Sequence, residues 1–190
     1  MKLTAMKNDR GMGLIELIVY SALTVVVLSV VGGILITILT VQRNVVNGAT
    51  TAEQAQLIAE TVESGVRNAT AIQIENFSSG DQMVTARSAK TGSTITWSCL
   101  AWYFTANSVH GGNIRYLRSN SAIVTPNSSE LSNWTLLGEG VSPVSSTPVF
   151  SLAGTSLSLQ FSEQVESDPA VTINSTSYVR GGPWKSDPCF

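Results

Sequence analysis

The sequence has few of the residues from which active sites are usually built. Of its 190 residues, two are cysteine, one is histidine and 13% are Asp, Glu, Lys or Arg. The single histidine, His110, precedes Gly111 and Gly112, so we expect it at the solvated tip of a turn rather than as a catalytic base or metal ligand. Glycine-rich phosphate loops and the common hydrolase motifs do not occur. The composition therefore predicts no enzyme, no cofactor and no metal site.

Charge is scarcest in one segment near the amino terminus. No Asp, Glu, Lys or Arg occurs from Leu17 to Val41. As a helix, this run would be roughly 37 Å long at about 1.5 Å per residue, which exceeds the ~30 Å hydrocarbon core of a bilayer. A chain of this size cannot bury such a helix on every face. The run therefore predicts a single membrane-spanning helix.

Basic residues on the two sides of the run predict its orientation. Lys2, Lys7 and Arg10 precede it, whereas Arg43 is the only basic residue between it and Arg67. Because basic flanks stay in the cytoplasm, we expect a cytoplasmic amino terminus and an exported remainder. Without residues 1–11 the chain keeps eight basic and twelve acidic residues, with no basic stripe. Nucleic acid is therefore not an expected partner.

The two cysteines, Cys99 and Cys189, both lie in the part expected to be exported. An even number of cysteines in an oxidising compartment favours a disulfide. Such a bond would close a loop of about 90 residues, which the chain-entropy argument values at somewhat over 4 kcal/mol. Two free buried thiols are the alternative.

One charged residue, Glu16, stands at the head of the apolar run. Asp, Lys or Arg at the centre of a membrane helix costs about 2.5 to 3.5 kcal/mol even on the milder insertion scales. A carboxylate in an inserted helix therefore needs either a partner or access to the lipid headgroups. A simple membrane anchor would offer only the headgroups.

The stretch "DRGMGLIELIVYSALTVVVL" resembles the signal of type IV prepilins and pseudopilins, in which a short basic leader ends in glycine and an apolar helix follows. The resemblance implies cleavage by a prepilin peptidase between Gly11 and Met12 and methylation of the new amino terminus at Met12. Glu16 would then be the fifth residue of the mature chain. In the family this glutamate pairs with the amino group of a neighbouring subunit, which implies an assembly role for Glu16.

Two glycines, Gly32 and Gly33, interrupt the apolar run. Each costs about 1 kcal/mol of helix propensity relative to alanine. They either soften the helix locally, as the resemblance implies for subunits that pack into a filament, or allow close helix packing. The sequence does not separate these two roles.

The rest of the chain divides into an amphipathic segment and a β-rich head. Residues 12–42 form the expected transmembrane and assembly helix, residues 43–74 its amphipathic continuation, and residues 75–190 the extracytoplasmic head. The predicted apolar stripe of the amphipathic segment consists of Ala52, Ala55, Ala59, Val62, Val66, Ala69 and Ile72. The predicted strands are 83–86, 94–104, 114–118, 134–137, 156–161 and 170–179, and Gly111 and Gly112 mark a hairpin turn. The aromatic cluster Trp97, Trp102, Tyr103 and Phe104 favours core packing over a binding surface.

This order of elements is similar to the α+β lollipop fold of type IV pilins, a long helix packed on an antiparallel sheet. The head is similar in layout to PilW-like minor pilins and J-type pseudopilins. The resemblance implies a structural subunit, a minor pilin, of a pilus or pseudopilus, held first in the cytoplasmic membrane and then in a surface filament. Its implied partners are the prepilin peptidase, other pilin subunits, the assembly machinery and the membrane. The alternative is an uncleaved single-pass membrane protein with a β-rich binding or sensor domain.

Overall fold

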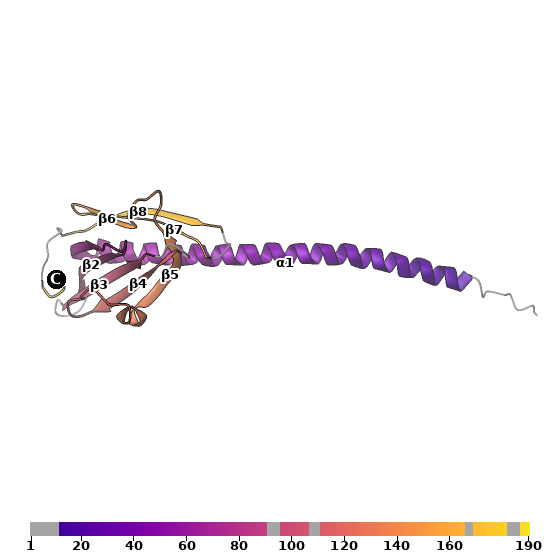
Figure 1. Ribbon diagram of the computed structural model, residues 1–190, viewed down its shortest axis with the longest axis horizontal. Coiled ribbons are helices and arrows are strands. Elements are labelled where there is room, and N and C mark those ends of the chain that lie inside the picture. Colours follow the sequence, from indigo (N-terminus) through magenta and orange to yellow (C-terminus); the bar gives the residue numbers. More distant parts are fainter. Residues whose placement is uncertain (1–11, 91–95, 107–110, 166–168, 182–186) are drawn as a thin grey trace, which may run out of the picture. The chain divides into compact units, whose positions relative to one another are not determined.

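The computed structural model describes residues 12–90, 96–106, 111–165, 169–181 and 187–190. Contacts divide the chain into two units, residues 1–46 and 47–190. The expected α+β class is confirmed, because one long helix precedes an eight-stranded antiparallel sheet (Figure 1). The elements are α1 (Met12–Arg67), β1 (Ala69–Asn76), β2 (Gln82–Lys90), β3 (Thr96–Thr105), β4 (Gly112–Ser119), the 3-10 helix η1 (Glu130–Asn133), β5 (Thr135–Ser142), β6 (Phe150–Ala153), β7 (Ser156–Glu163) and β8 (Val171–Tyr178).

The helix ends at Arg67, so the predicted continuation to residue 74 is wrong. Asn68 closes the last turn, because its backbone N–H and its side-chain Nδ2 both donate to the carbonyl of Ser64, at 3.2 and 2.9 Å. The chain then enters β1, whose β-branched Thr70, Ile72 and Ile74 recur at every second position. β-Branched side chains at period two fit a pleated strand better than a helix.

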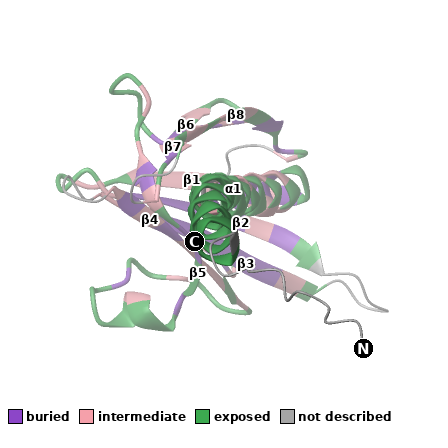
Figure 2. Ribbon diagram, turned by 90° about the vertical axis from the view of Figure 1, so that its right-hand side faces the viewer, coloured by how far each residue is buried: buried purple, intermediate pink, exposed green. Residues whose placement is uncertain are grey.

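The last part of α1, from Thr51 onward, forms the centre of the core in the second unit. Its buried stripe contains Ala55, Ile58, Val62 and Val66, each no more than 1% exposed. The predicted stripe omitted Ile58 and included two alanines, at positions 52 and 59, that are only half-buried. Strands of the sheet lie on both sides of the helix when it is viewed end-on (Figure 2). The sheet therefore wraps around this part of α1.

The sheet order is β1-β2-β3-β4-β5-β7-β6, and β8 pairs with the free side of β7. The six predicted strands correspond to β2, β3, β4, β5, β7 and β8, whereas β1 and the four-residue β6 were not predicted. The predicted hairpin is confirmed as the β3–β4 pair. Gly111 has a φ of +74°, which a glycine adopts without steric cost. His110 lies outside the described residues.

Strand β3 is buried on both of its faces. Leu100, Trp102 and Phe104 belong to the cluster around the helix, whereas Ala101 and Tyr103 belong to a second cluster. That second cluster, on the other face of the sheet, also contains Met83 and Trp134, with Phe77, Leu117, Ile123 and Leu131 packed against it. The predicted core role is confirmed for three of the four aromatic residues, since Trp97 is only half-buried.

A glycine on α1 makes the approach of the sheet possible. A Cβ atom on Gly65 would lie 2.3 Å from Cη2 of the fully buried Trp102. We expect Gly65→Ala to lower the free energy of unfolding by about 2 kcal/mol, because about 3 kcal/mol of overpacking outweighs about 1 kcal/mol of gained helix propensity. Denaturant titration of the full chain in detergent micelles measures this change. Gly48→Ala, on the same helix with no atom within 4 Å, is the control and should not destabilise.

Candidate assembly helix and tethered carboxyl end

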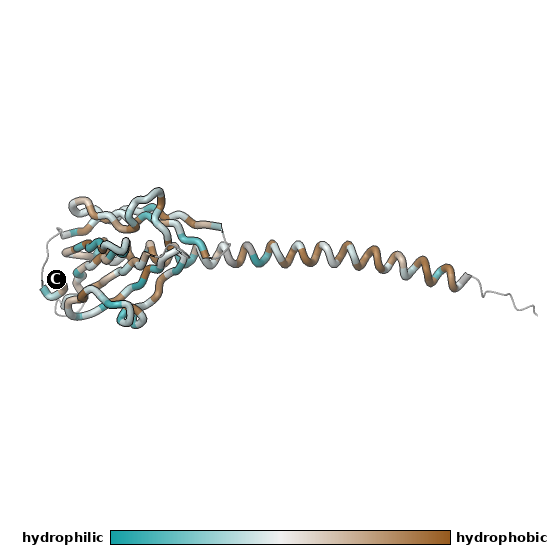
Figure 3. The backbone as a smooth tube through the Cα atoms, viewed as in Figure 1, coloured by the Kyte–Doolittle hydropathy of each residue, from teal (hydrophilic) through white to brown (hydrophobic). Residues whose placement is uncertain are grey.

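The first part of α1 presents its apolar side chains to its surroundings. Every large apolar side chain from Leu14 to Val41 is between 49% and 69% exposed. The helix is long and apolar enough to cross a membrane, as the brown colour of its first part in Figure 3 indicates. Its most apolar stretch is not buried. Apolar surface of this extent is unfavourable in water and requires lipid or other protein around it.

The serine and threonine hydroxyls in this run are satisfied within the helix itself. The run contains Ser21, Thr24, Ser29, Thr37 and Thr40. Each hydroxyl donates to a backbone carbonyl three or four residues earlier, at distances of 2.7 to 3.0 Å. A hydroxyl bonded in this way does not need water, so these side chains are compatible with a hydrocarbon environment. The positions of Ser and Thr in an apolar helical run are the sequence signal for this bonding.

Glu16 differs from these hydroxyls. Its carboxylate has no hydrogen bond and no ion pair among the described residues, and its side chain is exposed. A carboxylate cannot donate to its own backbone, so it cannot satisfy itself as serine or threonine does. Any partner that neutralises Glu16 in an apolar environment must therefore come from another molecule or from the undescribed leader.

The other residues predicted to act in this helix are Met12, which follows the cleavage position Gly11, and the glycine pair at positions 32 and 33. Gly11 lies outside the described residues, and α1 begins at Met12. Gly32 and Gly33 lie inside an uninterrupted helix, and a Cβ atom on either would meet nothing within 4 Å. The glycines are therefore not required by any contact within the described part of the chain, which leaves both softening and packing between subunits open.

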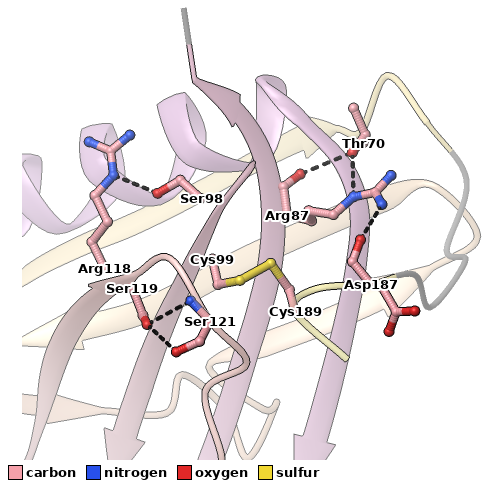
Figure 4. The surroundings of a disulfide bond; sticks show 9 residues. All are labelled: Thr70, Arg87, Ser98, Cys99, Arg118, Ser119, Ser121, Asp187 and Cys189. Atoms are coloured by element: carbon pink, nitrogen blue, oxygen red, sulfur yellow. Dashed lines mark hydrogen bonds between the residues drawn. A yellow bond between two sulfur atoms is a disulfide. The ribbon is translucent and has the colours of Figure 1, made fainter. Parts of the chain in front are cut away.

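The carboxyl end of the chain is fixed to the sheet by a disulfide. Cys99 on β3 is bonded to Cys189, with a Cα–Cα distance of 5.3 Å (Figure 4). The two residues are buried, and because their sulfurs are bonded to each other, the alternative of two free buried thiols is wrong. The bond ties residues 187–190 to the strand at the centre of the head, where a terminal segment would otherwise fray.

Arg87 on β2 makes a second connection to the same segment. Its Nη1 donates to the carbonyl of Asp187 at 2.7 Å, and its Nε donates to Oγ1 of Thr70 at 3.1 Å (Figure 4). The guanidinium also lies 4.1 Å from the ring centroid of Trp97. One side chain therefore joins β1, β2, β3 and the carboxyl end.

We expect Arg87→Ala to lower the free energy of unfolding by about 1 to 2 kcal/mol, since it removes two charge-assisted hydrogen bonds and a partly exposed cation–π contact. Proteolysis near residue 187 should also become faster. Arg118→Ala is the control, because Arg118 donates from Nε to Ser98 and does not contact the carboxyl end (Figure 4). Equal proteolysis of the two variants would contradict this role of Arg87.

Glu163, at the end of β7, was not predicted as a special residue. It is fully buried beside Gly138 and Ile58, and neither carboxyl oxygen makes a hydrogen bond. Burial raises the pKa of Glu163 to about 7, and the nearby backbone of Glu139 offsets only part of that rise. Its signal in the sequence is its place on the same face of the strand as Leu157, Leu159 and Phe161.

Among the described residues, no three His, Cys, Asp or Glu side chains lie close enough together to hold a metal ion. The chain matches no protein-family description, no curated protein and no solved structure. The fold and the site together define an α+β protein with a disulfide-tethered antiparallel sheet and one amino-terminal helix long and apolar enough to span a membrane.

Proposed function

We propose that this protein is a structural subunit of a type IV pilus or a related pseudopilus, most similar in layout to a minor pilin. The observation that carries the proposal is Glu16, an unpaired carboxylate at the start of an exposed apolar helix, five residues after Gly11. A simple anchor accounts for the apolar helix but gives no reason for this placement of a charge.

In this proposal α1 has two successive environments. It first spans the cytoplasmic membrane with residues 1–11 in the cytoplasm, where a prepilin peptidase cuts after Gly11 and Met12 is methylated. The helix then leaves the lipid and packs among the helices of other subunits in a surface filament, with the help of the assembly machinery. Both environments are apolar, which agrees with the exposed side chains of Leu14 to Val41 and with the satisfied hydroxyls among them.

Glu16 has a specific role in that packing. Its carboxylate pairs with the amine of Met12 of a neighbouring subunit, so the charge fixes the register between adjacent helices. An ion pair in an apolar environment is favourable only when both charges are present, because either alone is left desolvated. The pair therefore selects a single axial stagger of subunits.

The experiment that tests this proposal is the intact mass and amino-terminal sequence of the protein from membrane and sheared fractions of its native host. A chain that begins at Met12 and is heavier by one methyl group is the expected result. The control is the same host without its prepilin peptidase, in which residues 1–11 should remain. An uncut chain in cells with an active peptidase would overturn the proposal and favour the uncleaved single-pass protein.

A further inference from the structure

One other side chain in the apolar run has an unsatisfied polar atom. From Leu14 to Val41 the side chains with nitrogen or oxygen atoms are Glu16, Tyr20 and the five serines and threonines described above. The phenol of Tyr20 makes no hydrogen bond to any described residue, and Tyr20 is 62% exposed. A hydroxyl without a partner is costly in an apolar environment, so Tyr20 needs a partner for the same reason as Glu16.

Tyr20 and Glu16 lie on the same face of α1. They are four residues apart, which places them about 6 Å apart along the helix axis and about 40° apart around it. Thr24 is the next residue on this face, and its hydroxyl already donates to the carbonyl of Tyr20 at 2.7 Å. The unsatisfied groups are thus confined to one short stripe. It begins at the amine that cleavage would create at Met12 and ends at Tyr20.

The chemistry of the two unsatisfied groups is complementary. A phenol donates one hydrogen bond, whereas a carboxylate only accepts and has two oxygens to do so. Glu16 can therefore accept from an amine and from a phenol at the same time. Within one chain Tyr20 and Glu16 are not bonded to each other, although residues four apart on a helix are neighbours. Donor and acceptor are therefore both available to another molecule.

The stagger that pairs Glu16 with an amine also determines what lies beside Tyr20. Positions 12 and 16 are about 6 Å apart along the axis, so this pairing displaces the neighbouring helix by about one turn. The same displacement brings Glu16 of the neighbouring helix to about the level of Tyr20. Polar groups of membrane helices face other helices rather than lipid, so the stripes of adjacent parallel subunits converge.

We propose that Tyr20 donates a hydrogen bond to Glu16 of a second, parallel copy of this chain in the assembled filament. Each carboxylate would then accept from the amine of the subunit on one side and from the phenol of the subunit on the other. One Glu16 would thus connect three successive chains. This inference rests on the proposed function and adds a second donor at the same site.

Tyr20→Phe tests the hydrogen bond, because it removes the hydroxyl and keeps the ring. In the native host we expect this variant to be inserted, cut and methylated as the wild type is. Its amount in sheared fibres should fall roughly tenfold, as for one lost hydrogen bond to a charged group. Tyr178→Phe is the matched control, since it removes an exposed phenol from the head, and it should enter fibres at the wild-type level. Immunoblots of membrane and sheared fractions measure both pools.

Photo-cross-linking locates the partner of Tyr20. A chain with p-azidophenylalanine at position 20 is expressed together with the wild-type chain, so that mixed filaments form, and sheared fibres are irradiated. We expect cross-links to residues 12–17 of a second copy, identified from fragment masses. The control carries the same group at position 18, in place of Ile18, which lies on the opposite side of the helix. It should not link to residues 12–17.

The outcomes separate this inference from the proposed function. A tenfold loss of Tyr20→Phe from fibres, with cross-links to residues 12–17 from position 20 but not from position 18, supports the hydrogen bond. Wild-type amounts of Tyr20→Phe in fibres that contain the processed wild-type chain overturn the inference and leave the proposed function intact. Equal cross-linking from both positions, or cross-links to a different protein alone, also overturns it. A wild-type chain that is uncut and absent from fibres overturns both.

Discussion

Replacing Glu16 by alanine is expected to leave the protein in the membrane but to reduce its amount in sheared surface fibres by roughly tenfold to hundredfold. The structure gives this carboxylate no partner among the described residues, although the serine and threonine hydroxyls of the same run are all satisfied. If the neighbouring amine is its partner, the variant leaves that amine buried and unpaired. Loss of a hydrogen bond to a charged group removes about 1.5 to 3 kcal/mol. Because about 1.4 kcal/mol corresponds to a factor of ten, the expected decrease in the amount in fibres is roughly tenfold to hundredfold.

Two further variants make this measurement specific to the charge. Glu16→Gln keeps the size of the side chain but not its charge, and should be defective in the same way. Glu53→Ala removes an exposed carboxylate from the other unit of the chain, and should enter fibres at the wild-type level. Immunoblots of membrane and sheared fractions measure both pools. Wild-type amounts of Glu16→Ala in the fibres would contradict the assembly role.

Glu16 was predictable because its surroundings lack charge, whereas its partner was not. From Leu17 to Val41 no other residue could neutralise it, so the sequence alone identifies it as an exception. The proposed partner belongs to another chain, and neither one sequence nor one isolated structure contains it. The disulfide was easier to predict, since the chain has only one possible pair of cysteines.

The errors in the predicted fold occur where two periodicities overlap. Ala69 and Ile72 extend the three-and-four spacing of the helix, but Ile72 and Ile74 also alternate as a strand requires. Arg67 in the last turn followed by Asn68 is a helix-end signal, but asparagine is a weaker stop than glycine or proline, and the prediction followed the apolar spacing past it. β6 was missed because four residues are too few to establish a period of two.

The buried Glu163 was missed for a different reason. The alternation in "SLSLQFSE" places position 163 on the inner face. Carboxylates are rarely fully buried, however, so the predicted strand ends at residue 161 and leaves Glu163 out. The structure accommodates it because Gly138 has no side chain. A Cβ on Gly138 would lie 2.6 Å from Oε1 of Glu163. Glu163 can therefore be buried only because residue 138 on β5 has no Cβ atom.

Glu163 is expected to make the head less stable as the pH rises. Its pKa is about 7 in the folded protein, above its ordinary value of 4.5. The folded state therefore holds this proton more tightly than the unfolded state does, so the free energy of unfolding falls between about pH 4.5 and pH 7 and then levels off. A shift of that size corresponds to about 3 kcal/mol.

Glu163→Gln isolates this effect, because glutamine has nearly the same shape and does not titrate. Its amide adds an offset that does not depend on pH, so the informative quantity is the change with pH in the difference between variant and wild type. We expect the variant to gain about 3 kcal/mol on wild type between pH 4.5 and pH 8. Thermal unfolding of the full chain in detergent micelles, followed by circular dichroism across this range, measures the difference.

The position of Glu163 also predicts where the loss of stability begins. It lies in one of the two register pairs between β7 and β5, Val141↔Glu163 and Ser142↔Ser162, next to the hydrogen bond from the Gln164 N–H to the Gly140 carbonyl. Ionisation there should first loosen the attachment of β6, β7 and β8, so hydrogen exchange in β7 should speed up with pH beyond its ordinary chemical dependence. Glu139→Gln, an exposed position on β5, is the control and should follow wild type. If Glu163→Gln also followed wild type at every pH, ionisation of the buried carboxyl would not be the cause.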